Sequence, residues 1–351
     1  MKDFIKRIEG QVMFWWNQNR SNYEITETSD TWLHPVAWTI HALAKITSLM
    51  FSWRLTYAKK PAYLSDSKIQ KLKDKYYLYI ELAKKHQNKH GFFNHKHCDA
   101  TLTTGLLSMI PEFNIQLEVA RTNDGFWRRR QLDNPCYPKN SGSTISRDMM
   151  IGIYWYLWEN KRLHLAESTL KHAKAHSYVL GLGDPARLVM MPPGEATLAA
   201  LINKLGGKRR FFTDRQLKPW PKDMRSYHVH LLMMNGLLHG KIYGKIPSSL
   251  FSTFKHYAEA EHNKNNPLHQ YAHSIYSDGD LTDSVDLLLN EQWWPSNKLP
   301  TRRERENDWV TSRDGDEGGA WYPATDDLDK EHNGGDFLIV AHLILKDLEV
   351  I

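Results

Sequence analysis

Residues 146–159 read Ser-Arg-Asp-Met-Met-Ile-Gly-Ile-Tyr-Trp-Tyr-Leu-Trp-Glu, and this stretch decides the fold. Ser146 is a residue type that begins helices, and Asp148 falls in the first turn, where a carboxylate meets the positive end of the helix dipole. The apolar run from Met149 to Trp158 is about half the length of a membrane span. We therefore expect a helix inside a protein core, with methionine and aromatic side chains used for packing.

The same helical spacing of apolar residues recurs along most of the chain. Helices are expected over residues 4–16, 33–57, 68–90, 102–109, 146–159, 164–176, 195–205, 224–238, 248–262, 283–290 and 336–348. No segment alternates as a strand does, and no fixed repeat indicates a solenoid. The sequence therefore predicts an all-α fold, a closed ring of helical hairpins with long loops at one end. One domain is expected over residues 1–351, with residues 1–30 as an N-terminal helix and turn.

The composition is that of an ordinary globular protein, with 41% hydrophobic and 25% charged residues. Lysine and arginine total 46 against 40 acids, and the resulting charge of +6 favours anionic partners. The two cysteines, Cys98 and Cys136, are too few for a disulfide framework and predict a reducing compartment. The N-terminus lacks the apolar core of a secretory signal. A cytoplasmic protein without membrane insertion is expected.

Several function classes are disfavoured by missing motifs. The chain has neither a phosphate-binding glycine loop with its lysine nor a dinucleotide fingerprint after a strand. His95, His97 and Asp99 match no strong zinc signature. The lysines and arginines around Lys68 and Arg209 are interpreted as solvated faces, and nucleic-acid binding through them is the less favoured alternative. Neither a cofactor nor a metal is predicted.

Candidate substrate-binding residues lie just before and at the start of the helix at Ser146. Residues 123–130 combine Asp124, Trp127 and three consecutive arginines, and Arg147 follows Ser146 on a loop that contains glycine. The chain also contains 13 Trp and 16 Tyr, residue types that often line sugar platforms. We expect these residues to form one wall of a cleft.

A second candidate region is the acidic, glycine-rich loop of residues 308–336. Its polar and aromatic candidates for substrate binding or catalysis are Asp314, Glu317, Trp321, Tyr322 and His332. The glycines let the backbone approach a ligand closely, and the acids beside aromatic rings suit a sugar or a cation. The alternative interpretation is an acidic surface loop that caps the last helix.

The pattern of helical hairpins, with Ser-Arg-Asp at residues 146–148 and His-Asn-Gly-Gly-Asp-Phe-Leu at residues 332–338, resembles the six-hairpin (α/α)-toroid carbohydrate-active enzymes. The resemblance covers about residues 30 to 350. It implies a cleft built by loops at one end of the ring. The implied partner is a polysaccharide or an oligosaccharide.

A glycoside hydrolase needs two carboxyl groups on either side of the scissile bond. We assign Glu317 as the acid, because glutamate has the higher reference pKa and the loop between Trp309 and Trp321 could desolvate it. Asp148 would then activate water.

Two alternatives remain open. In a polysaccharide lyase on an anionic glycan, Arg147 would neutralise a uronate while a histidine or Tyr322 removes the proton. The other alternative is a noncatalytic structural or binding protein of a larger assembly.

Overall fold

The computed structural model describes residues 54–93, 98–133, 143–183, 192–208, 227–259, 266–299 and 335–351, together with residues 188 and 190. This part of the chain is mostly helical, with ten α-helices, two 3-10 helices and one two-stranded sheet. The α-helices are α3 (Asp66–Lys84), α4 (Ala100–Leu107), α6 (Arg147–Glu159), α7 (Leu163–Ala175), α9 (Pro192–Lys204), α10 (Tyr227–Tyr243), α11 (Ser248–Glu259), α12 (Pro267–Ser274), α13 (Thr282–Leu289) and α14 (Gly335–Asp347). The 3-10 helices are η2 (Pro111–Phe113) and η3 (Leu117–Ala120).

The structure confirms the predicted helices in the described ranges, but the prediction of no strands is wrong. Leu55–Tyr57 forms β1, which pairs antiparallel with β2 (Lys245–Pro247), so the expected helix over residues 33–57 does not extend to its predicted end. The partner of β1 is almost two hundred residues away, and a local spacing pattern cannot reveal such pairing. The expected helices over residues 4–16 and 33–53 lie outside the described residues.

Helix α12 was not predicted. It has only eight residues, which is too short to show a clear apolar period. Its start nevertheless carries a signal, because the Asn266 side chain accepts hydrogen bonds from the amides of Leu268 and His269, and Pro267 occupies the first turn.

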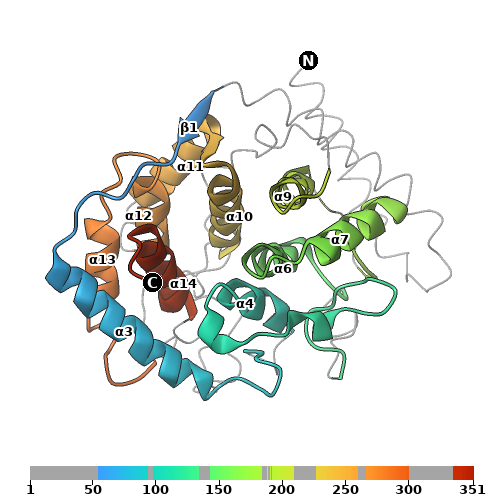
Figure 1. The fold of residues 1–351 in the computed structure, drawn as a ribbon, viewed down its shortest axis with the longest axis horizontal. Coiled ribbons are helices and arrows are strands. Elements are labelled where there is room, and N and C mark those ends of the chain that lie inside the picture. The colour runs from blue at the N-terminus through green and yellow to red at the C-terminus, as the bar shows by residue number, and fades with distance from the viewer. Residues whose placement is uncertain are drawn as a thin grey trace, which may run out of the picture.

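Six helices have few or no exposed side chains along their central turns. The fully buried runs include residues 100–107 of α4, 149–157 of α6, 195–202 of α9, 233–240 of α10 and 337–345 of α14, and α12 buries five of its eight residues. These helices pack in the order α4, α6, α9, α10, α12, α14, and α14 returns to α4 (Figure 1). The six helices therefore form a closed circuit of contacts, called here the helical circuit.

The remaining helices lie outside this circuit and are amphipathic. Helix α3 buries Leu72, Tyr76, Tyr79 and Ile80 against α14 and α13. Helix α7 packs on α6 and α9, α11 packs on α12, and α13 packs on α12 and α14. The buried apolar side chains of inner and outer helices form one continuous cluster. Among the described residues, no helix has the length and apolar content to cross a membrane.

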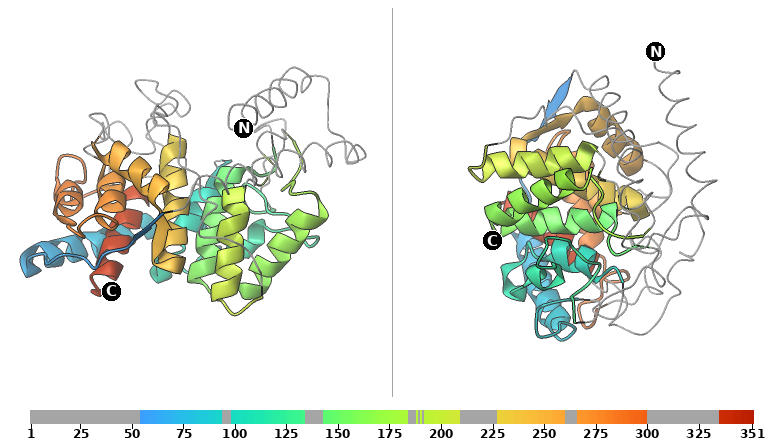
Figure 2. Two further views of the ribbon diagram at one scale, coloured as in Figure 1. Left: turned by 90° about the horizontal axis from the view of Figure 1, so that it is seen from above. Right: turned by 90° about the vertical axis from the view of Figure 1, so that its right-hand side faces the viewer.

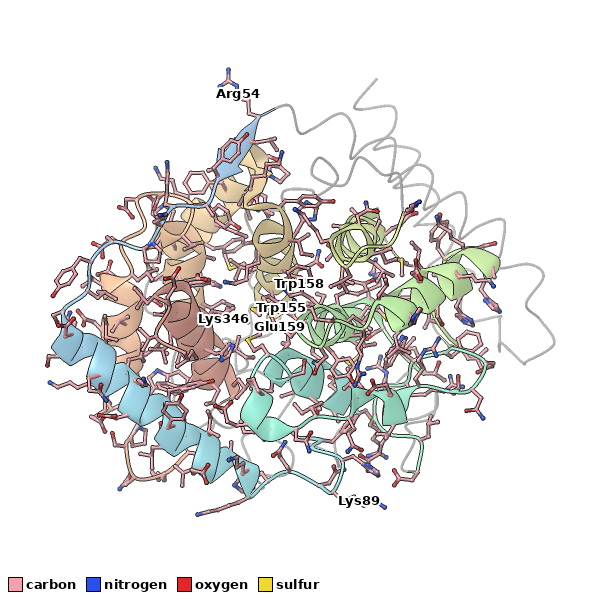
Figure 3. The ribbon with its side chains drawn as sticks, viewed as in Figure 1. Arg54, Lys89, Trp155, Trp158, Glu159 and Lys346 are labelled. Atoms are coloured by element: carbon pink, nitrogen blue, oxygen red, sulfur yellow. The ribbon has the colours of Figure 1, made fainter. Side chains whose placement is uncertain are left out.

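Charged residues tie three helices of the circuit together at their last turns. Lys346 of α14 lies 2.8 Å from Glu159, the final residue of α6 (Figure 3). Asp347 of α14 accepts hydrogen bonds from Lys241 of α10 and from the Tyr271 hydroxyl of α12, each at 2.6 Å. Helices α6, α10 and α14 therefore end on the same side. Figure 2 (left) shows the helices standing side by side, with the C-terminus at the lower edge.

Helices α4 and α6 approach each other through glycine. A Cβ added at Gly105 would lie 2.4 Å from the Gly152 carbonyl carbon, and a Cβ added at Gly152 would lie 2.4 Å from the Leu102 carbonyl oxygen. Such distances leave no room for a side chain, so the two backbones are in direct contact. This contact explains the glycine in the middle of the otherwise bulky residues 149–158.

Cys98, at the start of α4, is disulfide-bonded, and Cys136 is the only other cysteine of the chain. The sequence-based interpretation of the two cysteines as reduced is therefore wrong for Cys98. Two cysteines without a recognisable spacing offered no signal for the bond.

Replacing Gly152 by alanine should destabilise the protein. The new methyl group would meet the backbone of α4, which cannot move aside, so we expect a loss of about 3 kcal/mol or more in the free energy of unfolding. Gly236→Ala is the control, because the nearest atoms there are the ends of the Leu250 and Phe254 side chains. Urea denaturation of both variants measures the difference. Equal losses would mean that the α4 and α6 backbones are not in tight contact.

Acid should weaken the core at His342. This side chain of α14 is 4% exposed, and burial, together with the charges of Lys346 and Lys241, lowers its pKa to about 3. Below about pH 6.5 the unfolded chain takes up a proton that the folded chain refuses, so stability falls as the pH drops toward 3.

Between about pH 7 and about pH 4.5, the free energy of unfolding should fall by about 2–3 kcal/mol less in His342→Gln than in the unmodified protein. Thermal or urea unfolding at the two pH values measures this difference, and the exposed His164→Gln variant is the control. An unchanged pH dependence in the His342 variant would contradict the prediction.

Candidate functional site

One buried arginine links the starts of α4 and α6. Arg129 is 4% exposed, and its Nη1 donates to the Asp99 carboxylate at 2.8 Å. Its Nε and Nη2 donate to the carbonyl and hydroxyl oxygens of Ser143, also at 2.8 Å. Asp99 is the N-cap residue of α4, and Ser143 precedes the N-cap of α6 by three residues. The guanidinium group therefore holds the two helix starts together.

Backbone hydrogen bonds extend this link to the end of α7. The Thr101 amide donates to the Arg129 carbonyl, and the Arg129 amide donates to the Thr144 carbonyl. The Thr144 amide in turn donates to Leu182, and Ser143 pairs with Gly183 beyond α7. The starts of α4 and α6 and the end of α7 thus lie together, on the side opposite the carboxyl ends of α6, α10 and α14. We call this side the amino-terminal face.

Helix α14 also begins at the amino-terminal face. Helices α6 and α14 each have 13 residues, and a helix of that length is about 20 Å long. Their last turns are joined by Lys346 and Glu159, and both helices pack on α4, so we infer that they run in the same direction and that their first turns reach the same side. The chain therefore begins α14 at Gly335 on the face where α6 begins at Arg147.

The predicted residues Arg147 and Asp148 stand at this face in the first turn of α6. Arg147 is exposed and Asp148 is partly buried. Ser146 is the N-cap residue by backbone position and is 4% exposed, but its side chain makes no capping hydrogen bond. Its buried hydroxyl oxygen has no hydrogen-bond partner within the described part of the chain.

Glu195 is a further carboxyl group at the amino-terminal face, in the first turn of α9. It is 1% exposed, the Tyr178 hydroxyl donates to it at 3.1 Å, and Lys174 lies 3.9 Å away. Burial and the neighbouring Glu195 carboxylate raise the pKa of Tyr178. The preceding residue Ser177 and Tyr178 itself have positive φ values of 51° and 66°, which are costly for residues with a side chain. Glu195 has no distinguishing signal in the sequence, because its position indicates only an acid at a helix start.

A cluster of cationic and aromatic side chains lies beside the end of α7. It consists of Arg121, Asp124, Phe126, Arg128, His172 and His176, and is called here the Arg121–His172 cluster. The Phe126 ring meets the His172 ring edge-on at 4.0 Å between centroids, and the His172 and His176 rings are 4.2 Å apart. Arg128 lies over the Phe126 ring at 5.8 Å. Each of these side chains except Asp124 is partly buried, and Asp124 is exposed.

Burial favours the neutral form of His172 in this cluster. Burial is the main cause that lowers the pKa of His172 to about 4, and the nearby His176 and Arg121 lower it further. A neutral imidazole at neutral pH can accept as well as donate a hydrogen bond. The Thr122 hydroxyl donates to the Asp124 carboxylate and lowers the pKa of Asp124.

Of the predicted wall residues, Asp124 lies in the Arg121–His172 cluster, whereas Trp127 lies beneath it. The Trp127 side chain is 2% exposed, and its indole nitrogen donates to the Thr169 hydroxyl at 3.0 Å. The Arg121 guanidinium group covers its ring at 5.7 Å. In this arrangement Trp127 packs the loop against α7 and presents no face to a ligand.

The other predicted site residues are Glu317, Asp314, Trp321, Tyr322 and His332, and all five lie outside the described residues. They precede α14 in the sequence, and His332 stands three positions before its first residue. Among the described residues, no three histidine, cysteine or acidic side chains converge to hold a metal ion.

No family model, curated protein or solved structure matches this chain.

Replacing Arg129 should unfold the amino-terminal face. Arg129→Gln leaves the Asp99 carboxylate buried without its cation, and we expect a loss of about 3–5 kcal/mol in the free energy of unfolding. The double variant Arg129→Gln with Asp99→Asn should recover part of this loss, because no charge then remains buried. Arg162→Gln, which breaks an exposed pair with Glu118, should cost less than about 1 kcal/mol. Urea denaturation measures all three, and a double variant no more stable than the single one would refute the explanation.

Proposed function

We propose that this chain is a carbohydrate-active enzyme, a glycoside hydrolase built on a helical (α/α) toroid with its active site at the amino-terminal face. The observation that carries the proposal is the closed helical circuit, in which α6 and α14 begin at the same face. A ring of this kind brings loops from distant parts of the sequence to one end. The resemblance to the six-hairpin enzymes supports the same arrangement.

The chemistry that we propose uses two carboxyl groups. Asp148 is partly buried in the first turn of α6, beside the exposed Arg147. It is therefore suited to act as the base that activates water. Glu317 is proposed as the acid that protonates the leaving group. It lies in the segment that joins α14 at the amino-terminal face, so its sequence position is compatible with this role.

Substrate binding is assigned to side chains around these two carboxyl groups. Arg147 is exposed next to Asp148, and Asp124 is exposed on the neighbouring loop, so both can reach a sugar chain. Asp314, Trp321, Tyr322 and His332 are proposed to bind sugar from the segment before α14. Glu195 is a positioning residue in this scheme, because it is buried and bonds to Tyr178.

A polysaccharide lyase is the second candidate, and one specific feature favours it. Arginine and neutral histidine lie together in the Arg121–His172 cluster, and elimination from a uronate needs a cation at the carboxylate and a base at the adjacent carbon. The products separate the two reactions, because hydrolysis yields only new reducing ends whereas elimination also yields an unsaturated sugar.

Asp148→Asn should abolish most of the activity. We expect kcat to fall by about 10²–10⁴ on the substrate found in a panel of neutral and uronic polysaccharides, since a general base contributes about that much. Reducing-end release and ultraviolet absorbance of unsaturated products are the measurements. Asp133→Asn, an exposed acid, is the matched control and should retain full activity. A folded Asp148 variant with normal turnover would refute the assignment of Asp148, and no turnover by the unmodified protein on any glycan would favour the noncatalytic alternative.

A further inference from the structure

Two nitrogen atoms of the Arg121–His172 cluster are buried without a hydrogen-bond partner among the described residues. They are Nε of Arg121 and Nε2 of His172. The Arg121 Nε always carries a hydrogen, so it is a donor in need of an acceptor. Buried donors in native proteins are almost always satisfied, and an unsatisfied one often marks the place of an ion, a ligand or a water. The cluster therefore has unused hydrogen-bonding capacity.

Gly125 lets these two side chains come together. Its φ is 106°, and a Cβ added there would lie 3.2 Å from Nη2 of Arg121 and 3.2 Å from Nδ1 of His172. Any other residue would be strained in this conformation and would place its side chain between the two groups. Arg121 follows η3 and His172 lies in the last turn of α7, so the convergence brings two separate elements to one point.

The charge of the cluster favours an anion. Apart from the two imidazoles, it holds the guanidinium groups of Arg121 and Arg128 and the carboxylate of Asp124. The single Asp124 carboxylate is exposed, so solvent screens its charge, whereas Arg121 is partly buried and its Nε has no acceptor among the described residues. A guanidinium group also binds planar oxyanions better than a point charge does, because its donors match two oxygen atoms at once.

We propose that the Arg121–His172 cluster binds the carboxylate of a uronate unit in an acidic glycan. The Nε and Nη groups of Arg121 donate to the carboxylate oxygens. In the complex the carboxylate favours the protonated form of His172, which donates through Nε2 while Nδ1 keeps its hydrogen bond to the Asp124 backbone. The partly buried Phe126 ring contacts the apolar face of the same sugar ring. The glycan part of this inference rests on the proposed function, and it narrows the substrate class from carbohydrates in general to those that carry uronic acid.

The test is calorimetric titration of the full chain with an oligogalacturonate and with a neutral cello-oligosaccharide of equal length. The uronic probe should bind, and the neutral probe should bind at least about tenfold more weakly. Arg121→Gln and His172→Gln should each lower the affinity for the uronic probe by about tenfold or more and leave the affinity for the neutral probe unchanged. Equal affinity for both probes would overturn the proposal.

Matched variants on α7 control for a general charge effect. Lys171→Gln removes an exposed cation next to His172 in the sequence, and His164→Gln removes an exposed histidine of the same helix. Both should change the affinity by less than about twofold. If Lys171→Gln weakens binding as much as Arg121→Gln does, the attraction is unspecific and the proposal is wrong. Arg121→Lys keeps the positive charge and should still weaken binding, because it lacks the planar set of donors.

A competition experiment separates a sugar site from a site for any oxyanion. Inorganic sulfate or phosphate that displaces the oligogalacturonate at equal concentration would overturn the glycan assignment. Turnover of neutral glycans without any preference for uronate would contradict this inference and leave the proposed function intact. Uronate binding that depends on Arg121, in a chain that turns over no glycan, would support this inference and contradict the proposed function.

Discussion

Helix α6 has no polar face from Met149 to Leu157, and this constraint shapes the rest of the described structure. A helix that is apolar on every side must be surrounded, because any exposed side would leave large side chains in water. Helices α4, α7, α9 and α10 pack against it. The Trp155 indole nitrogen donates to the Met234 carbonyl at 3.1 Å, so this buried donor of α6 is satisfied by a neighbouring helix. The circuit follows because α4, α9 and α10 are buried in the same way and need neighbours of their own.

Some charged side chains at the two ends of the circuit match the helix dipoles. The last turns of α10 and α14 carry Lys241 and Lys346, which meet the negative ends of the dipoles. The starts of α4, α6 and α9 carry Asp99, Asp148 and Glu195. Helices that run in the same direction place the positive ends of their dipoles on the same face. Carboxylates at that face are therefore favoured at several helix starts together. The gathering of acids on one face is therefore a consequence of parallel packing.

The sequence predicts the helices well because each has its own local signal. The expected range 146–159 differs from α6 by one residue at its start, and the expected range 283–290 is displaced from α13 by one residue. The elements that were not predicted lack a local signal of sufficient length. Helix α12 is shorter than the window over which a period can be read, and β1 depends on a partner far along the chain. The closing contact of α14 with α4 is also nonlocal, so the sequence suggested a ring only through its run of helices without a solenoid repeat, and could not show which helices close it.

The residues of the candidate site could be predicted from the sequence only where a charged side chain lies at a helix start. Asp148 and Arg147 were found in this way, because the Ser-Arg-Asp sequence marks the beginning of α6. Trp127 was expected to bind sugar, but its residue type could not show that Arg121 and Thr169 enclose it. Arg129 was noticed only as one of three arginines, since its buried pairing with Asp99 depends on how two loops meet.

The amino-terminal face holds several features that cost stability. The Arg129 and Asp99 charges are buried, the Ser146 hydroxyl and the Arg121 Nε have no hydrogen-bond partner in the described structure, and Tyr178 has a positive φ. A buried ion pair is often no better for stability than apolar residues of the same size, and unsatisfied donors are worse. Proteins keep such features where the arrangement of groups matters more than the free energy of folding. The same face carries Asp148 and receives the chain at the start of α14, so these costs lie where we propose the active site.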